Sequence, residues 1–231
     1  MKGDMQYPQK SSVSAISLRF SILAPLALSL AMLVAAFTFS LFQQEEDFTK
    51  ELVDGSFISA QKIYATAVKT DTDKLSTALE FIVLDAGLRH AMLAKDRNAL
   101  LQQSLPIFQK LRQEYGITHF YFHAPKRDNF LRVHQPDRFG DTINRFTAMQ
   151  AEATGKPAAG LELGPLGTFT LRVVFPWYEG KRLIGYVELG EEIEHILKQI
   201  NMLAGIDLYL SIKKQYISQP AWLDGMKMLG R

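Results

Sequence analysis

The hydrophobic residues of this chain follow three patterns: an unbroken apolar run, a stretch with helical spacing, and a stretch in which apolar and polar residues alternate. The unbroken run covers residues 20–42, FSILAPLALSLAMLVAAFTFSLF, and contains no charged residue. A helix of this length extends about 35 Å, enough to cross a hydrocarbon core of about 30 Å. Pro25 lies inside the run, and a membrane helix tolerates proline better than a soluble one does. The run therefore predicts a transmembrane helix.

The charges on either side of this run predict its orientation. Lys2, Lys10 and Arg19 precede the run, and Glu45, Glu46 and Asp47 follow it. By the positive-inside rule, residues 1–19 are cytoplasmic and the chain beyond the run is exported, so we expect a single-pass membrane protein whose domain lies outside the cytoplasm. The alternatives are a cleaved signal peptide and a buried core helix. A signal peptide usually has a shorter apolar region of about 7–15 residues, and no small-x-small site follows Phe42.

Apolar residues recur at helical spacing from residue 43 to about 94, with no proline in between. This pattern predicts one long helix, or two nearly end to end, with a possible break at the cap-like residues 70–73. A second helix is predicted after the N-cap Asp96 and ends at Gly116. We expect residues 43–115 to form a helical stalk, which either pairs with a second copy as a dimer or packs against its own domain.

After Gly116 the period changes from 3.6 to 2, which predicts strands. Turn-forming residues separate the first two strands at 125–129, and Glu179-Gly180 predicts a hairpin between the last two. The predicted strands are 117–123, 130–134, 159–163, 168–176 and 182–189; the predicted helices lie within 137–154, at 191–203 and from Pro220; and 205–217 reads as a further strand and hairpin. This order predicts an α+β fold, a PAS-like antiparallel sheet with flanking helices. Residues 116–203 would form the lobe and 204–231 the start of a further element.

Alternation along the strands sorts their side chains onto two faces of the sheet. The apolar face, predicted to be the core, carries Phe120, Phe122, Leu131, Val133, Leu171, Val173, Phe175, Leu183, Val187 and Leu189. The opposite face carries His119, Tyr121, His123, Arg132, His134, Thr170, Arg172, Tyr186 and Glu188. This second set is rich in aromatic residues and planar hydrogen-bond donors.

Such a face is suited to hold a small polar ligand. A guanidinium matches a carboxylate with two parallel hydrogen bonds, and Glu188 is able to meet an amine. The segment 137–160, with Arg145 and Phe146, is predicted to fold across this face as a lid, which favours a pocket. The alternative is a solvated face, or one that carries local salt bridges. A metal ion is not expected, because His119 and His123 lie over 13 Å apart on an extended strand at about 3.3 Å per residue.

Composition excludes several classes of function. The chain has 231 residues and no cysteine, which excludes disulfides, cysteine-ligated metals and a thiol nucleophile. Its formal charge of +2 is too nearly balanced for a nucleic-acid-binding protein. The sequence contains no P-loop, dinucleotide fingerprint, nucleophile elbow or HExxH motif. We therefore expect no enzymatic activity, no cofactor and no nucleic-acid partner.

The segment 130–194 resembles the extracytoplasmic Cache-type sensor region of bacterial transmembrane signalling proteins, closest to the double-Cache group. The resemblance is carried by the LRVH strand, the DRFGDTINRFT stretch, the ELGPLGTFTLRVVFPW hairpin and the GYVELGEEIEHI strand-to-helix. It implies a PAS-like sheet behind a long N-terminal helix, and a pocket on the sheet beneath the connecting loops. Combined with the face pattern, it gives the candidate ligand-binding residues Tyr121, Arg132, His134, Arg145, Arg172, Tyr186 and Glu188.

The resemblance also implies a function and partners. We expect a small-molecule sensor module of a receptor of the chemoreceptor, histidine kinase or cyclic-dinucleotide enzyme type. Its ligand would be an amino acid, a carboxylate or an amine, and its stalk would form a homodimer. Such receptors return through a second membrane helix, whereas this sequence stops at Arg231 without a second apolar run, so we expect the output module to be missing from it. The alternative is a membrane-anchored periplasmic interaction domain without a small ligand.

Overall fold

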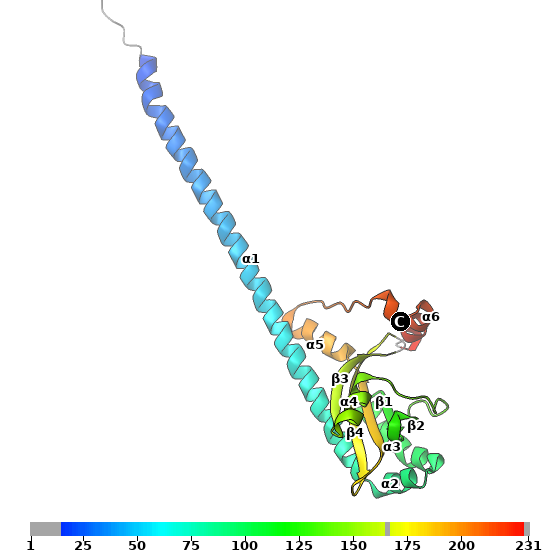
Figure 1. The fold of residues 1–231 in the computed structure, drawn as a ribbon. Coiled ribbons are helices and arrows are strands. Elements are labelled where there is room, and N and C mark those ends of the chain that lie inside the picture. Colours follow the sequence, from blue (N-terminus) through cyan, green and yellow to red (C-terminus); the bar gives the residue numbers. More distant parts are fainter. Residues whose placement is uncertain (1–14, 165–166, 229–231) are drawn as a thin grey trace, which may run out of the picture. The chain divides into compact units, whose positions relative to one another are not determined.

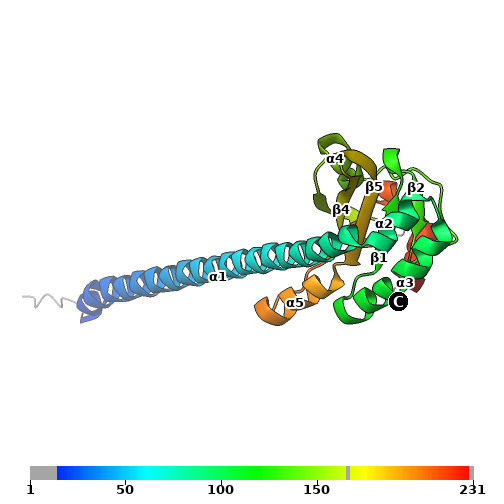
Figure 2. The same cartoon turned by 90° about the horizontal axis from the view of Figure 1, so that it is seen from below.

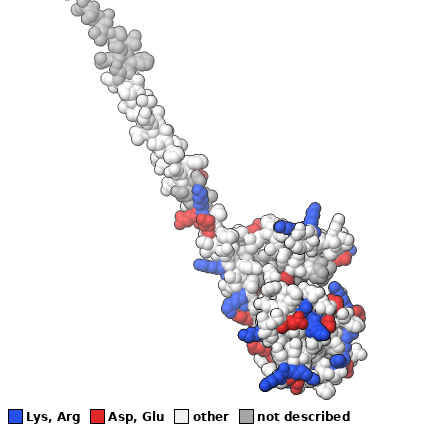
Figure 3. All heavy atoms as spheres, in the orientation of Figure 1, with Lys and Arg blue, Asp and Glu red and all other residues white. Residues whose placement is uncertain are grey.

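The computed structural model describes residues 15–164 and 167–228 and divides into two units, Met1–Phe57 and Ile58–Arg231. Helix α1 (Ala15–Leu84) begins in the first unit, where its apolar side chains are exposed; Leu33, for example, is 69% exposed. The part of this helix within Ile22–Leu84 is long and apolar enough to cross a membrane. Its uncharged segment is white in Figure 3, whereas charges of both signs are interspersed on the surface of the second unit. Lys2 and Lys10 lie outside the described residues.

The predicted helical stretch consists of α1 and α2 (Ala86–Leu93), which meet at Asp85. The Asp85 side chain accepts a hydrogen bond from the Leu88 N–H at 2.8 Å and so caps α2. The predicted break at residues 70–73 is wrong, because α1 continues through them. There the Thr72 hydroxyl donates to the Val68 carbonyl at 2.8 Å, one turn back, and so is satisfied within the helix.

Helix α3 (Arg97–Tyr115) has the predicted boundaries. The side chain of Asp96 accepts a hydrogen bond from the Ala99 N–H at 2.9 Å, which satisfies one free donor of the first turn. Gly116 has a φ of 72°, the left-handed conformation that ends a helix and that glycine adopts without strain. The prediction of both residues as helix ends is confirmed.

The five strands form one antiparallel sheet in the order β2-β1-β5-β4-β3 (Figures 1 and 2). They are β1 (His119–His123), β2 (Asn129–Arg132), β3 (Ala158–Leu163), β4 (Phe169–Glu179) and β5 (Arg182–Glu192). A short 3-10 turn, η1 (Pro125–Arg127), joins β1 to β2, and a tight hairpin joins β4 to β5. The α+β fold is confirmed.

Helices cover both faces of this sheet. On the core face, residues of α1, α2, α3 and α5 (Glu194–Ala204) pack with the apolar side chains of the strands, among them Leu75, Leu88, Leu100, Phe120, Val187 and Ile196. The buried residues of α1 begin at Ala60, so this part of the helix packs against its own domain. On the opposite face, α4 (Phe146–Thr154) packs on β3 and β4.

Leu183 is the exception to the predicted faces. A register shift between Trp177 and Tyr178 places an extra residue in β5, so that Leu183 pairs with Tyr178 and Gly185 with Trp177. The side chains of β5 therefore exchange faces at this bulge: Ile184 joins the core and Leu183 packs beneath α4. The prediction that Leu183 belongs to the core face is wrong for this reason.

The segment 205–217 was predicted as a strand and hairpin, and this is also wrong. It runs irregularly to a 3-10 turn, η2 (Lys214–Tyr216), before α6 (Gln219–Met228). Its alternating residues bury no common face, since Leu208 and Leu210 are 40% and 48% exposed. A strand requires a hydrogen-bonding neighbour, and the described sheet ends at β2 and β3 without pairing to this segment.

Candidate functional site

The polar face of the sheet holds a row of buried charged and aromatic side chains. The register places Tyr121 of β1 opposite both Arg132 of β2 and Glu188 of β5, so that all three side chains point to the same face. Arg172 of β4 lies on this face one step further along. None of these four residues is more than 5% exposed. The polar face is therefore buried rather than solvated, and it carries local salt bridges.

Glu188 is the centre of this charged cluster. One guanidinium nitrogen of Arg145 lies 2.5 and 2.6 Å from the two carboxylate oxygens, and Arg172 donates to Oε1 at 2.6 Å. His123 Nε2 lies 2.9 Å from Oε2. Burial would raise the pKa of Glu188, but the charges of Arg145 and Arg172 and the His123 hydrogen bond outweigh it, so that the pKa is well below its usual range. Glu188 is therefore ionised and neutralised within the cluster.

Arg145 comes from the residue before α4, which confirms that this segment folds across the polar face. Its side chain is 19% exposed, whereas the neighbouring Phe146 is 63% exposed. Glu162 of β3 fixes the start of α4, because its Oε1 accepts hydrogen bonds from the Thr147 N–H at 2.7 Å and the Thr147 hydroxyl at 2.9 Å. The helix is thereby anchored over the sheet by the strand that it covers.

Three buried polar atoms converge without a hydrogen bond at this point. The Oε2 atom of Glu162 lies 3.2 Å from Nε of Arg145 and 3.6 Å from Nε of Arg172. Each of these three atoms is buried, and none has a hydrogen-bond partner among the described residues. A buried polar atom without a hydrogen bond is destabilising, so these three atoms leave hydrogen-bonding capacity unused within the cluster.

The aromatic ring of Tyr121 lies close to three arginine side chains of this face. The guanidinium carbons of Arg132, Arg145 and Arg172 lie 5.5, 5.2 and 5.8 Å from the centre of its ring. Guanidinium groups at such distances are attracted by the negative face of the ring. Two strands and the residue before α4 thus direct three cations towards one aromatic side chain.

Comparisons with known proteins identify the family of this chain. A family of sensory domains, described as the double sensory domain of two-component sensor kinases, matches residues 59–221. This chain belongs to that family. The match covers more than half of the sequence and includes every strand and every candidate ligand-binding residue. The chain is thus a Cache-type extracytoplasmic sensor domain, as its resemblance implied.

Solved structures show the same fold. The sensor domain of the Vibrio cholerae histidine kinase DctB is 15% identical, with a TM-score of 0.55 over 66% of this chain and 60% of that one. A domain of a sensory box/GGDEF family protein from Vibrio parahaemolyticus is 14% identical, with a TM-score of 0.50 over 65% of each chain. The matched region thus spans less than two thirds of these solved domains. A comparison with curated proteins finds no match.

Arg132 has a different environment from the other two arginines around Tyr121, Arg145 and Arg172. Its two terminal nitrogens donate to the Asp141 carboxylate at 2.8 and 2.7 Å, and one also donates to the Arg138 carbonyl at 2.7 Å. The hydrogen bonds from Arg132 hold the pKa of Asp141 far below its usual range. Arg132 therefore anchors the loop between β2 and α4.

Two other candidate residues lie at the border of the charged cluster. The ring of His134 meets that of Tyr121 edge to face at 4.7 Å, and burial lowers its pKa to about 4, with the charges of Arg172 and Arg132 adding to the shift. Tyr186 is 2% exposed and packs with Ala151 and other apolar residues beneath α4. The structure thus brings together Tyr121, Arg145, Arg172 and Glu188, with Arg132 and His134 beside them and Tyr186 apart.

Sequence reasoning missed Glu162 and Asp141 and did not include His123 among the candidates. Glu162 pairs with Thr170 across β3 and β4, so alternation places it on the polar face. Assigning the residues of β3 to the two faces in the same way would have identified Glu162. Asp141 lies in a loop without periodicity, and nothing local in the sequence indicates that it binds Arg132.

Glu192, at the end of β5, is expected to make the stability of the fold depend on pH. Burial raises its pKa to about 7, the charge of Glu194 adds to the shift, and Arg172 opposes it. Because the folded-state pKa lies above the unfolded value of about 4.3, ionising Glu192 reduces stability as pH rises from about 4 to 7. We expect Glu192→Gln to be more stable than the wild type at pH 8, by about 2 kcal/mol, and equally stable near pH 4.

Thermal unfolding of both proteins between pH 4 and pH 8 measures this difference. Glu114→Gln, at an exposed position of α3, is the matched control and should behave as the wild type at every pH. A Glu192→Gln variant whose advantage does not grow with pH would contradict the raised pKa.

Proposed function

We propose that this chain is the membrane-anchored, periplasmic sensor module of a bacterial signalling receptor, and that it binds a small ligand beneath α4. The observation that carries the proposal is the buried cluster of Arg145, Arg172, Glu162 and Glu188, in which three polar atoms have no hydrogen-bond partner among the described residues. A structural salt bridge alone would favour complete hydrogen bonding, because each unpaired atom reduces its benefit.

The charges of the cluster favour a ligand that carries both signs. Arg145 and Arg172 are suited to hold a carboxylate, and Glu162 and Glu188 are suited to hold an ammonium group. Since the two arginines already pair with these carboxylates, a zwitterion exchanges partners without leaving a buried charge unpaired. Within the wider class of amino acids, carboxylates and amines, we propose a small amino acid or related zwitterion.

The proposed orientation and assembly are supported by α1. The basic residues before the apolar run favour an N-terminus in the cytoplasm and a sensor domain in the periplasm. Phe48, Leu52 and Phe57, beyond the run, are more than half exposed, which supports pairing with a second copy along the helix. The proposed signal is a displacement of the sheet relative to α1, whose Leu75 and Leu79 are fully buried in the shared core.

A thermal-shift screen of the full chain in detergent micelles tests the proposal, with amino acids, organic acids and amines at millimolar concentration. A ligand at about 100 times its Kd stabilises the folded state by about 2.7 kcal/mol, which gives a clear rise in Tm. We expect at least one zwitterion to stabilise the wild type and to have little effect on Arg145→Gln. The exposed Arg112→Gln serves as the matched control and should retain the response.

Two results would contradict the proposal. One is the absence of any stabilising compound across the three classes. The other is an equal shift for the wild type and Arg145→Gln, which would place binding elsewhere. Either result would favour the interaction domain without a small ligand.

A further inference from the structure

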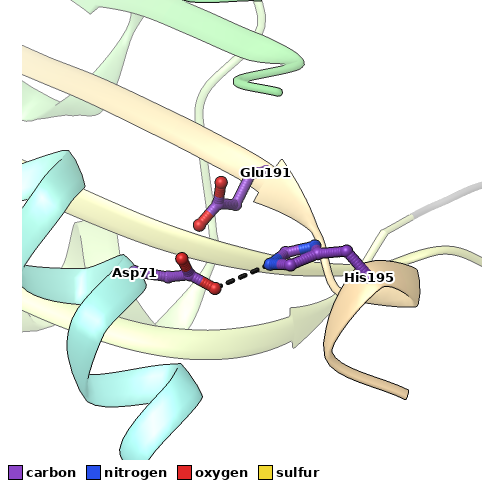
Figure 4. Close-up of side chains that lie close together, drawn as sticks. All are labelled: Asp71, Glu191 and His195. Atoms are coloured by element: carbon purple, nitrogen blue, oxygen red, sulfur yellow. Dashed lines mark hydrogen bonds and ion pairs between the residues drawn. The ribbon is translucent and has the colours of Figure 1, made fainter. Parts of the chain in front are cut away.

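A second polar cluster lies on the core side of the sheet, where α1, β5 and α5 meet. Asp71 comes from α1, Glu191 from the end of β5 and His195 from the first turn of α5 (Figure 4). One oxygen or nitrogen from each of the three side chains lies within 4.8 Å of the others. Residues up to 124 positions apart in the sequence thus present three possible metal-ligating atoms, two carboxylate oxygens and one imidazole nitrogen, close together.

The imidazole of His195 faces an acceptor on each side. Its Nδ1 lies 3.0 Å from the Glu192 backbone carbonyl and its Nε2 lies 2.7 Å from Oδ2 of Asp71. A neutral imidazole carries one N–H, so it satisfies only one of these contacts. Donation from Nδ1 to a backbone carbonyl is the arrangement that orients histidine ligands in metal sites and leaves Nε2 free to bind the ion.

Glu191 supplies an independent indication. Its side chain is 2% exposed, its carboxylate points towards Asp71 and His195 in Figure 4, and its Oε1 has no hydrogen-bond partner among the described residues. The other oxygen, Oε2, accepts from the Lys74 ammonium group at 2.6 Å, and the same ammonium lies 3.0 Å from Oδ1 of Asp71. The two carboxylates therefore already hold one cation between them.

We propose that Asp71, Glu191 and His195 form a binding site for a divalent transition metal ion of the zinc type. One imidazole nitrogen and two carboxylate oxygens are a known ligand set for such ions, with water completing the tetrahedron. Zinc bonds of about 2.0–2.2 Å require the ligand atoms to lie about 3.5 Å apart, so the cluster contracts slightly on binding. His195, whose side chain is 49% exposed, is free to make this movement.

The Lys74 ammonium group, which lies between the carboxylates of Asp71 and Glu191, would be displaced by the ion. Its side chain is 28% exposed and has a flexible four-carbon stem, so the ammonium group is able to turn outwards. A cavity of about 320 Å³, lined by Lys62, Thr66, Asp71 and His195 among others, gives the ion access from solvent. A bound ion would join α1 to β5 and α5, on the side of the sheet opposite Glu188, and does not depend on the proposed ligand.

Equilibrium dialysis of the untagged full chain in detergent against zinc chloride tests the site. We expect one zinc ion per chain, and a loss of affinity of about tenfold or more in His195→Gln and in Asp71→Asn. Lys74→Met removes the competing cation and should bind zinc more tightly than the wild type. The matched control is His90→Gln, a change at an exposed histidine of α2 outside the cluster, which should leave zinc binding unchanged.

The proposal is overturned if the wild type retains no zinc, or if His195→Gln and His90→Gln bind it equally. Weaker binding by Lys74→Met would also contradict it, since that result would show that Lys74 supports the cluster rather than competing for it. Circular dichroism of each variant checks that the fold is retained.

Discussion

Replacing Glu188 with glutamine is expected to reduce the free energy of unfolding by about 3–5 kcal/mol, the usual cost of removing one partner of a buried ion pair. The change leaves Arg145 and Arg172 close together without the carboxylate that neutralises both, and a neutral amide accepts from them only weakly. It also removes the charge that faces His123. Chemical denaturation at pH 7, followed by tryptophan fluorescence, measures the loss.

The control for this prediction is Glu179→Gln, a change of the same kind at the end of β4. Glu179 is 45% exposed and lies 3.5 Å from Arg89, so its ion pair is screened by water. Its replacement should change stability by less than about 1 kcal/mol. Equal effects of the two substitutions would show that Glu188 is not the centre of a buried charge cluster.

Trp177→Ala is expected to have a similarly large effect, about 3–5 kcal/mol, because it removes a large buried side chain and leaves a cavity. Trp177 is 1% exposed, packs against Phe122 at a ring distance of 5.8 Å, and donates from Nε1 to the Val83 carbonyl at the end of α1 at 2.9 Å. The substitution also removes one of the two side-chain hydrogen bonds to the Val83 carbonyl, the other being donated by Arg89 at 2.9 Å. Thermal unfolding of the variant measures the effect.

Trp222→Ala is the matched control, since Trp222 in α6 is 41% exposed. Its loss should cost clearly less than that of Trp177. If Trp177→Ala were no more destabilising than Trp222→Ala, this result would contradict the role of Trp177 in joining β4 to the end of α1.

Local signals predicted the elements of the fold well. Asp96 and Gly116 mark the ends of α3 because capping depends on residues close in sequence. The alternation of apolar and polar residues predicted all five strands to within three residues at each end. It also placed Tyr121, Arg172 and Glu188 on one face, because a side chain's face follows directly from its position along a strand.

The errors arose where structure depends on contacts between distant segments. The bulge at Trp177 and Tyr178 reverses the faces of β5, and alternation alone cannot reveal an extra residue in one strand. Residues 205–217 have an alternating pattern but no neighbouring strand to pair with. The helix break fell at Asp85 rather than at residues 70–73, because a cap-like residue is also tolerated inside a helix that packs on a core.

The same limit applies to the site. Arg145 was predicted as part of a lid, but its carboxylate partners are 17 and 43 residues away, and only the position of α4 on the sheet brings them together. The cluster of Asp71 and His195 spans 124 residues and could not be recognised from spacing. Chemistry that is assembled by tertiary packing is visible only in the folded chain.

The most direct test of a ligand site beneath α4 is amide hydrogen exchange of the full chain, with and without the most strongly stabilising compound of the thermal-shift screen. We predict slower exchange in α4 and in strands β1, β4 and β5 around Glu188, because the ligand fixes the helix over the sheet. Protection confined instead to the apolar groove between α1 and α3, which is lined by Phe81, Ile107 and Leu111, would contradict the proposed site.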